Sequence, residues 1–230
     1  MDAIQIRLKI YILKDIPINQ IQAKTAMFID TGFAGNEDLI QMHEENRFKP
    51  YTFDMLYPQE ASKIYKKGNI YTVTIRTIDR ALATYFLEIC VNHYTDEMKG
   101  LTAEVRIIPK KTIECLYTLT PAVIKGEKGY WRTYMSISDF EERLRVNLIK
   151  KWNYFENDKL PEDFQLYTLI QFLNDGPIAM EYKGIKLLGD KLRIQIADNE
   201  TAQKLAYLAL GTGICEMNTR GAGFVNYRWL

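Results

Sequence analysis

Cysteine and histidine are scarce in this chain. Its 230 residues include three cysteines and two histidines. Cys90, Cys115 and Cys215 lie far apart and form no Cys-x-x-Cys pair, so the spacing indicates neither a disulfide framework nor a zinc site. We therefore expect reduced, mostly buried thiols, and no metal or other cofactor.

Long apolar runs and an excess of one charge are also lacking. No stretch approaches the roughly 20 apolar residues of a membrane-spanning helix, and the sequence starts with a strand pattern rather than a signal peptide. We therefore expect a cytoplasmic protein with no membrane partner. The net charge of +1 neither favours nor excludes nucleic-acid binding, because a balanced total can conceal a basic face.

The apolar content is sufficient for a substantial core. Hydrophobic residues make up 47% of the chain and charged residues 26%, which is typical of ordinary soluble globular proteins. A chain of 230 residues fits one large domain or two domains of about 100 residues each. The pattern of the residues must decide between these two possibilities.

The first half has the pattern of a β-α-β-β-α-β unit. Apolar side chains alternate without error over residues 4–12, as in a strand of an antiparallel sheet with one buried face. Residues 18–32 carry a helical stripe, and Asp79 can cap a helix that continues to His93. Further strands are predicted at 49–53, 70–75 and 105–117, and a short helix at 36–46. This order is that of a ferredoxin-like fold.

The second half repeats the order more loosely. A capping box of Ser138 and Glu141 predicts the start of one helix, and Asn199 predicts the start of another. Extended segments are predicted at 116–124, 130–135, 166–173, 178–196 and 224–229. We therefore predict an α+β protein with two tandem ferredoxin-like domains of the kind found in RNA-recognition motifs, at residues 1–117 and 118–230.

A glycine-dense segment joins the last predicted helix to the last strand. It reads Gly211-Thr-Gly213-Ile-Cys-Glu-Met-Asn-Thr-Arg220-Gly221-Ala-Gly223-Phe224. Glycine lets a backbone approach a ligand closely and turn several N–H groups toward one point, which favours an anion such as phosphate. An ordinary surface turn would have the same composition, so the glycines alone leave both interpretations open.

Three segments of the second half occur together: Lys183-Gly-Ile-Lys-Leu-Leu-Gly-Asp-Lys-Leu-Arg-Ile-Gln-Ile196, Gly211-Thr-Gly213 and Arg220-Gly-Ala-Gly-Phe224. With a helix between the first two, they resemble the C-terminal half of the CRISPR-associated repeat-RNA endoribonucleases, the sixth numbered Cas family of the RAMP superfamily. The resemblance implies metal-independent cleavage of CRISPR repeat RNA, the pre-crRNA, to crRNA. In this reaction a ribose 2′-hydroxyl attacks the adjacent phosphate and leaves a 2′,3′-cyclic phosphate. Other Cas proteins of an effector complex and a second copy of the chain are further candidate partners.

The implied reaction needs a base for the 2′-hydroxyl, a proton for the leaving 5′-oxygen and positive charge at the phosphate. Histidine exchanges protons near neutral pH, and lysine carries positive charge. Some family members have a histidine and a lysine just before a Lys-Pro-aromatic-Thr-Phe strand, and here His43 precedes Lys49-Pro-Tyr-Thr-Phe53. The resemblance therefore implies that His43 and Lys49 are catalytic. Without it, His43 would be interpreted as an exposed helical residue among acidic ones.

The third catalytic role is unassigned. Relatives with this pair often have a tyrosine on the first helix, but no tyrosine occurs between Tyr11 and Tyr51. Phe28 takes the nearest position, and its place in the apolar stripe favours packing. Tyr51 could stand in, although a strand residue is equally suited to packing. His93 continues an apolar helical stripe, which favours a core or interface position.

RNA contact is expected from basic and aromatic side chains together with the glycine segment. Charge and stacking surface occur together at Lys128, Tyr130 and Arg132, and Arg143 and Arg145 lie on the following helix. An ordinary solvated surface would carry the same charges. The predicted RNA-binding residues are Gly211, Gly213, Arg220, Gly221, Gly223, Lys128, Arg132, Arg143 and Arg145, and further basic residues occur at Lys63, Lys66, Lys67, Lys125, Lys150 and Lys151.

Two other classes of function remain open. A noncatalytic RAMP subunit that binds crRNA in an effector complex would share the fold and the glycine segment without using His43 or Lys49 in chemistry. A ferredoxin-like enzyme or interaction module unrelated to RNA is the second alternative, since one fold supports many functions.

Overall fold

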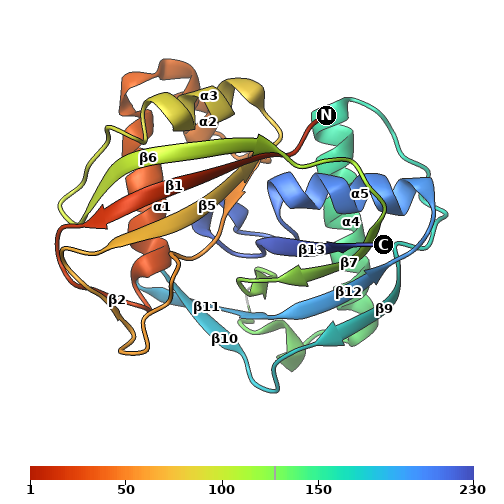
Figure 1. Cartoon of the computed structure of the whole chain (residues 1–230). Helices are drawn as coiled ribbons and strands as arrows, with labels where there is room; N and C mark the ends of the chain where they lie inside the picture. Colours follow the sequence, from red (N-terminus) through yellow and green to blue (C-terminus); the bar gives the residue numbers. More distant parts are fainter. Residues whose placement is uncertain (127) are drawn as a thin grey trace.

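The computed structural model describes residues 1–126 and 128–230. Its main features are two four-stranded antiparallel sheets, each with helices on one face (Figure 1). The first sheet has the strand order β3-β5-β1-β6, and the second has the order β13-β7-β12-β9. In both sheets the first and third strands of a β-α-β-β-α-β unit lie at the centre. The predicted α+β class with two tandem ferredoxin-like units is confirmed.

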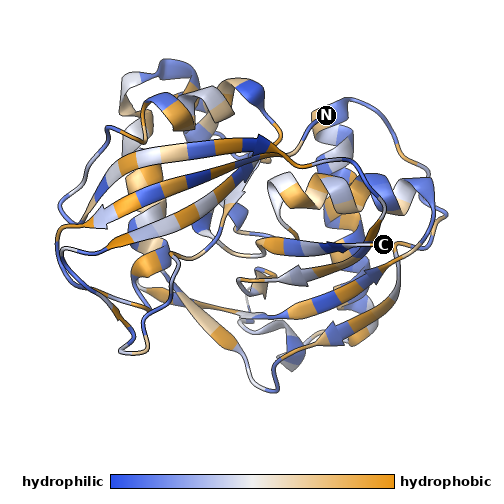
Figure 2. Cartoon of the chain, in the orientation of Figure 1, coloured by the Kyte–Doolittle hydropathy of each residue, from blue (hydrophilic) through white to orange (hydrophobic). Residues whose placement is uncertain are grey.

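The first sheet contains β1 (Ile4–Ile12), β3 (Tyr51–Phe53), β5 (Ile70–Thr77) and β6 (Met98–Ile107). Leu8 of β1 lies opposite Val73 of β5 and Ala103 of β6. The apolar side chains of β1 are buried, while Arg7 and Lys9 are exposed, and the alternation is visible along the strand in Figure 2. The short strands β2 (Ile16–Pro17) and β4 (Ile64–Tyr65) pair with each other beside this sheet.

The helices of the first half are α1 (Ile21–Gly32), α2 (Glu37–Glu44) and α3 (Arg80–Glu88), with a 3-10 turn η1 (Phe33–Gly35) after α1. Asp79 caps α3, as predicted, by accepting a hydrogen bond of 2.8 Å from the Leu82 amide. The helix ends before His93, whose ring packs on Phe28 of α1 at 5.0 Å between centroids. The predicted packing role of Phe28 is therefore confirmed. The helix predicted to continue to His93 ends at Glu88, and His93 is half-buried in the turn region that follows.

The second sheet contains β7 (Ile113–Thr118), β9 (Tyr167–Phe172), β12 (Leu192–Ile196) and β13 (Val225–Trp229). Helices α4 (Ile137–Glu156) and α5 (Glu200–Thr212) cover it, and Asn199 caps α5 as predicted. A hairpin of β10 (Ile178–Tyr182) and β11 (Ile185–Asp190) is inserted between β9 and β12 and forms a separate small sheet with β8 (Ala122–Val123). The hairpin reaches the first half, where Glu181 accepts a hydrogen bond of 2.7 Å from Asn19.

Three further predicted elements differ from the structure. The strand predicted at 105–117 is two strands, β6 and β7, interrupted near Pro109, which has no amide proton for a sheet. Because β7 pairs with β12 and β13, the chain passes to the second sheet between residues 107 and 113, earlier than the predicted boundary at 117 and 118.

The other two differences lie before and at the start of α4. Residues 130–135 contain a 3-10 turn, η2 (Trp131–Thr133), instead of a strand. The fully buried carboxylate of Asp190 binds the Tyr130 hydroxyl and the Trp131 indole N–H at 2.7 and 2.6 Å and so sets this turn. Ser136 and Asp139 form the capping box of α4, two residues before the predicted pair.

Each half has its own hydrophobic core, and a few polar side chains join the halves. Tyr207 of α5 donates to the carbonyl of Ile108 at 2.5 Å and accepts from the amide of Ala3 at 3.1 Å. Its hydroxyl thus connects the segment before β1 with the segment between β6 and β7. Within residues 1–126 and 128–230, no helix combines the length and apolar character needed to cross a membrane.

Candidate active site between the two halves

The glycine loop, residues 211–224, lies at the junction of the two halves. The carbonyl of Gly221 accepts a hydrogen bond of 3.0 Å from Gln22 on α1. Gly221 has φ +81°, and a Cβ atom there would lie 2.8 Å from the Phe53 ring of β3. Only glycine fits both the left-handed backbone and this close approach to the first half. The loop therefore packs directly on α1 and β3.

The four glycines are buried, and their N–H groups do not converge on an anion site. Gly211 lies within α5, and the N–H groups of the other three glycines bind protein carbonyl oxygens: Gly213 to Ala209, Gly221 to Asn218 and Gly223 to Pro121. The expectation of converging glycine amides is thus corrected, because carbonyl oxygens of the protein already accept from these donors. The glycines shape the loop, and its polar side chains face the junction.

Lys151 of α4 holds the loop from within. Its side chain is buried, and Nζ donates to the carbonyls of Gly213 and Cys215 at 2.9 and 3.3 Å and to Asn218 Oδ1 at 2.7 Å. Asn218 in turn donates to the carbonyls of Ile214 and Ala222. Burial lowers the pKa of Lys151 to about 7. This lysine therefore supports the loop and is not part of a solvated helix face.

A cleft of about 580 Å³ separates the glycine loop from the segment after α2. Residues 45–49 of the first half form one wall, and residues 215–220 of the loop form the other. Tyr154 of α4 and Tyr182 of β10 also line it. The ring of Phe48 lies 5.9 Å from that of Tyr154, so aromatic side chains of both halves meet here. The cleft thus combines stacking surfaces with the cations Arg47, Lys49, Lys125 and Arg220.

Lys49 is fixed at the wall of this cleft by the end of α2. Its Nζ donates to the carbonyl of Glu45 at 2.6 Å and to the carbonyl of Met42. These carbonyls have no partner within the helix at its C-terminus, where a cation is also favoured by the helix dipole. Burial lowers the pKa of Lys49, and the nearby charge of Arg47 adds to this effect.

His43 is half-buried in contact with Asp30 of α1, and it is not among the residues that line the cleft. Its Nδ1 is 3.4 Å from Asp30 Oδ1, and the other carboxylate oxygen of Asp30 binds Nη1 of Arg220. Because Arg220 lines the cleft, Asp30 connects the histidine to the glycine loop. The structure thus brings together His43, Lys49 and Arg220 of the predicted site residues.

Tyr51 does not reach the cleft. Its side chain is 1% exposed, and its ring packs edge-on against Phe33 and Phe86. Burial raises the pKa of Tyr51, and the negative charge of Asp30 adds to the rise. Tyr51 is therefore a core residue whose hydroxyl keeps its proton.

The predicted arginines outside the loop are paired with carboxylates of the protein. Arg132 binds the buried Asp190 at 2.7 Å, and Arg145 binds Glu142 at 2.8 Å on its own helix. Arg143 binds Glu216, a residue of the cleft wall, at 2.7 Å. Lys128 is exposed. Only Arg143 among these residues is thus in contact with the cleft.

Sequence reasoning missed Asp30, Tyr154 and Tyr182 as residues of this site. The ring of Tyr182 lies 5.8 Å from the guanidinium carbon of Arg220. Asp30 has one sequence signal, since it is an acidic residue next to an apolar stripe on the first helix. Tyr154 and Tyr182 have none, because their position depends on how the halves are joined.

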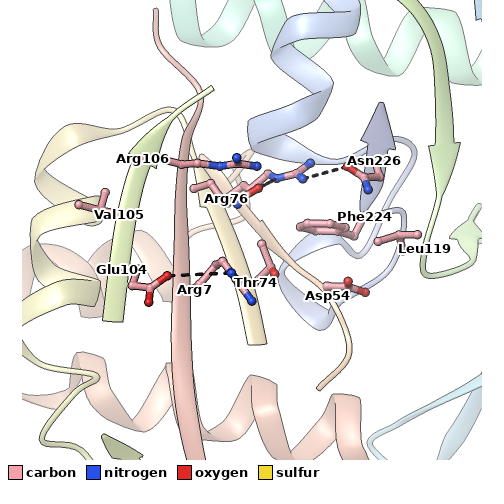
Figure 3. Close-up of a pocket in the computed structure, with 11 residues that line it drawn as sticks. Arg7, Asp54, Thr74, Arg76, Glu104, Val105, Arg106, Leu119, Phe224 and Asn226 are labelled. Atoms are coloured by element: carbon pink, nitrogen blue, oxygen red, sulfur yellow. Dashed lines mark hydrogen bonds and ion pairs between the residues drawn. The ribbon is translucent and has the colours of Figure 1, made fainter. Parts of the chain in front are cut away.

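A second hollow lies on the open face of the first sheet, beside β13 (Figure 3). Arg7, Arg76 and Arg106 line it from β1, β5 and β6, and Phe224 lines it from the second half. The guanidinium of Arg76 packs over the Phe224 ring at 4.5 Å and donates to the carbonyl of Val225 at 2.6 Å. Arg76 therefore joins the halves, while Arg7 is exposed and faces the solvent.

No group of three or more histidine, cysteine, aspartate or glutamate side chains that could hold a metal ion occurs in the part of the chain that the structure describes, which leaves out residue 127.

Known structures share the fold over nearly the whole chain. A structure described as a CRISPR associated protein Cas6 has 21% identity and a TM-score of 0.68, with 98% of this chain and 99% of that chain covered. A RAMP protein binding different RNA substrates has 18% identity, a TM-score of 0.75 and the same coverage. A product complex of Cas6 from Thermus thermophilus has 16% identity and a TM-score of 0.65, with 99% of both chains covered.

The sequence itself matches a family profile. No curated protein matches the chain significantly in sequence. The profile of the family described as CRISPR associated protein Cas6, C-terminal, matches residues 101–227, which include the glycine loop and the Lys183 to Ile196 segment that carried the resemblance. This match covers more than half of the chain, and the protein belongs to the Cas6 family of CRISPR-associated proteins.

Proposed function

We propose that this protein is a metal-independent endoribonuclease that cleaves CRISPR repeat RNA. The single observation that carries the proposal is the cleft between the halves, where Lys49 and Arg220 lie on opposing walls. Asp30 connects Arg220 to His43. A strand of RNA in this cleft would meet cations for its phosphates and the rings of Phe48, Tyr154 and Tyr182 for its bases.

The reaction divides into proton transfer and charge stabilisation. His43 takes the proton of a ribose 2′-hydroxyl, the 2′-oxygen forms a bond to the adjacent phosphorus, and the bond from phosphorus to the 5′-oxygen breaks. The leaving 5′-oxygen takes a proton from water, and the products carry a 2′,3′-cyclic phosphate and a 5′-hydroxyl. An ammonium group has three N–H donors, and two of those on Lys49 bind carbonyls. The third can point to the phosphate, where positive charge stabilises the pentavalent transition state.

The glycine loop supplies the second wall of the proposed RNA site. Its buried glycines hold the turns, and Arg220 is the side chain of the loop that reaches phosphate. Arg143 and Lys125 extend the basic surface beside Glu216. In the second hollow, on the open face of the first sheet, Arg7 and Arg106 offer further phosphate contacts (Figure 3). Repeat RNA bound at both places would contact the two halves of the chain at once.

A noncatalytic RNA-binding subunit is the second candidate function. The observation that favours it is the first helix, which contains no tyrosine and whose Phe28 is fully buried beside His93. The known RAMP structure with a TM-score of 0.75 is described by its binding of different RNA substrates. Cleavage and binding must therefore be measured separately.

The test uses repeat RNA of the CRISPR array from the same genome, in EDTA, under single-turnover conditions. We expect the wild type to cleave it, and we expect His43→Ala to lower the cleavage rate by about 10²- to 10⁴-fold, the range typical of a lost proton-transfer group. Lys49→Ala should lower the rate by about 10²- to 10³-fold, because it removes charge stabilisation of the transition state. Binding, measured by filter retention, should change little for His43→Ala because the wall cations remain.

His93→Gln is the matched control, since it alters the other histidine of the chain and should keep the wild-type rate. A 2′-deoxy substitution at the cleaved nucleotide should block the reaction in the wild type. Full cleavage by His43→Ala would remove this residue from the mechanism. Tight binding by the wild type without any cleavage would leave the noncatalytic function.

A further inference from the structure

Asp30 occupies a position between two donors of different kinds. Arg220 binds one of its carboxylate oxygens and approaches from the glycine loop. The other oxygen, Oδ1, is buried and accepts no hydrogen bond from any residue in the described ranges 1–126 and 128–230. The ring nitrogen Nδ1 of His43 lies 3.4 Å from it. One carboxylate oxygen thus accepts a hydrogen bond from Arg220, and the other lacks a donor on the side where His43 lies.

A buried acceptor without a donor is unfavourable, and a carboxylate oxygen is a strong acceptor. A small approach of the ring would give an Nδ1–H donor to Oδ1, since the separation of 3.4 Å is only slightly longer than a hydrogen bond. In a neutral imidazole one nitrogen carries the proton and the other accepts. A proton on Nδ1 therefore leaves the lone pair on Nε2.

We propose that Asp30 is a positioning residue that holds His43 as the Nδ1–H tautomer, so that Nε2 is the atom that takes the 2′-hydroxyl proton. This inference rests on the proposed role of His43 in cleavage. Arg220 fixes the carboxylate through its other oxygen and prevents it from turning away. When Nε2 takes the proton, the ring becomes a cation beside a carboxylate that stays ionised, and this pairing stabilises the charge. Asp30 itself neither gains nor loses a proton.

Arg220 makes the effect of one substitution predictable. A guanidinium can only donate hydrogen bonds, so in Asp30→Asn the amide oxygen must face Arg220. The NH₂ group of the new side chain then faces His43 and donates to Nδ1. His43 must carry its proton on Nε2 in this variant, and Nε2 can no longer act as a base. The substitution keeps the size of the side chain while it reverses the tautomer.

The experiment reads the tautomer directly by NMR. Two-bond ¹H–¹⁵N correlation spectra of the ¹⁵N-labelled full-length chain distinguish the two ring nitrogens, and only His43 and His93 contribute signals. His43→Gln assigns the signals. We expect an Nδ1–H form for the neutral ring of His43 in the wild type and an Nε2–H form in Asp30→Asn. Asp38→Asn, an exposed carboxylate on α2, is the control and should behave as the wild type.

Cleavage and binding by the same proteins complete the test. Asp30→Asn should lower the single-turnover rate by about 10³- to 10⁴-fold, with RNA affinity within about threefold of the wild type because Arg220 stays tethered. The double variant with His43→Ala should lose no more than either single variant, since the two residues act as a unit. An unchanged tautomer in Asp30→Asn, an Nε2–H form in the wild type, or a reversed tautomer with full cleavage would each overturn the inference. The spectra need no cleavage, so failure of the proposed function is recognised separately, by full activity of His43→Ala.

Discussion

Lys151 is a cation inside the protein, with 2% of its side chain exposed. Lys151 belongs to α4, and its ammonium group lies at the C-terminal end of α5. Carbonyl groups there have no partner within the helix, and a positive charge is favourable. Burial nevertheless lowers its pKa to about 7 from an ordinary value of 10.5. The residue that shapes the glycine loop is therefore also one whose charge changes near neutral pH.

The lowered pKa predicts a dependence of stability on pH. Between pH 7 and 10.5 the unfolded chain keeps the Lys151 proton and the folded chain releases it. The unfolded state then binds more protons, so the free energy of unfolding rises with pH, by at most about 1.4 kcal/mol per pH unit. We expect Lys151→Met to lose this slope in urea denaturation at pH 7.0 to 8.5, a window set by the cited pKa and kept below the titration of unfolded thiols, about 8.5.

Lys150→Met is the matched control, because Lys150 is the exposed neighbour on the same helix. It should retain the wild-type slope. An equal slope in Lys151→Met would mean that the buried amine keeps its proton throughout this range.

The glycine loop is the element that joins the two halves, and its conformation depends on a few positions. Gly223 has φ +65°, a left-handed backbone conformation that costs free energy for residues other than glycine. A Cβ atom there would also collide with the carbonyl oxygen of Ile214. The position thus combines two separate requirements for glycine.

We predict that Gly223→Ala lowers the free energy of unfolding by about 3 kcal/mol or more, the sum of left-handed strain and a steric clash. Gly184→Ala separates the two contributions. Gly184 has φ +78° in the hairpin turn and no atom within 4 Å of an added Cβ, so it should cost only ~1 kcal/mol. Equal losses in the two variants, measured by urea denaturation, would show that the loop yields to the methyl group.

Elements with a local cause were predictable from the sequence. The alternation of β1 and the caps Asp79 and Asn199 depend on neighbours within a few residues, and all three are found as expected. The turn at 131–133 is different, because the carboxylate of Asp190 sets it from a distant part of the chain. Local propensity cannot report such a contact.

The same distinction holds for the candidate site. His43, Lys49 and Arg220 belong to short local motifs, and reasoning from sequence named them. Asp30 contacts Arg220, and Tyr182 lines the cleft, only because the two halves pack in one arrangement. Motifs therefore identified the residues proposed for chemistry, and the junction between the halves supplied those that surround them.

The whole molecule consists of two cores held in one arrangement by polar contacts and by the packing of α5 and the glycine loop on the first half. The proposed site requires that arrangement. Both chain ends lie beside the second half (Figure 1), and the N-terminus is 3.8 Å from Glu156. Arg76 is the most deeply buried of the charged connections, with 3% of its side chain exposed. It binds Gln5 at 3.0 Å in the first half and the carbonyl of Val225 in the second.

Removal of Arg76 should uncouple the two cores. In Arg76→Met the carbonyl of Val225 and the amide oxygen of Gln5 lose their donor, which costs about 1–3 kcal/mol for each buried group left unpaired. We expect calorimetric unfolding to change from one transition to two overlapping ones, with a calorimetric enthalpy above the van't Hoff enthalpy. Arg7→Met is the control on the same sheet face. Its pair with Glu104, at 4.0 Å, is exposed, so its loss should cost less than about 1 kcal/mol and leave a single transition. A single transition in Arg76→Met as well would mean that the apolar contacts of α5 and the glycine loop suffice to couple the halves.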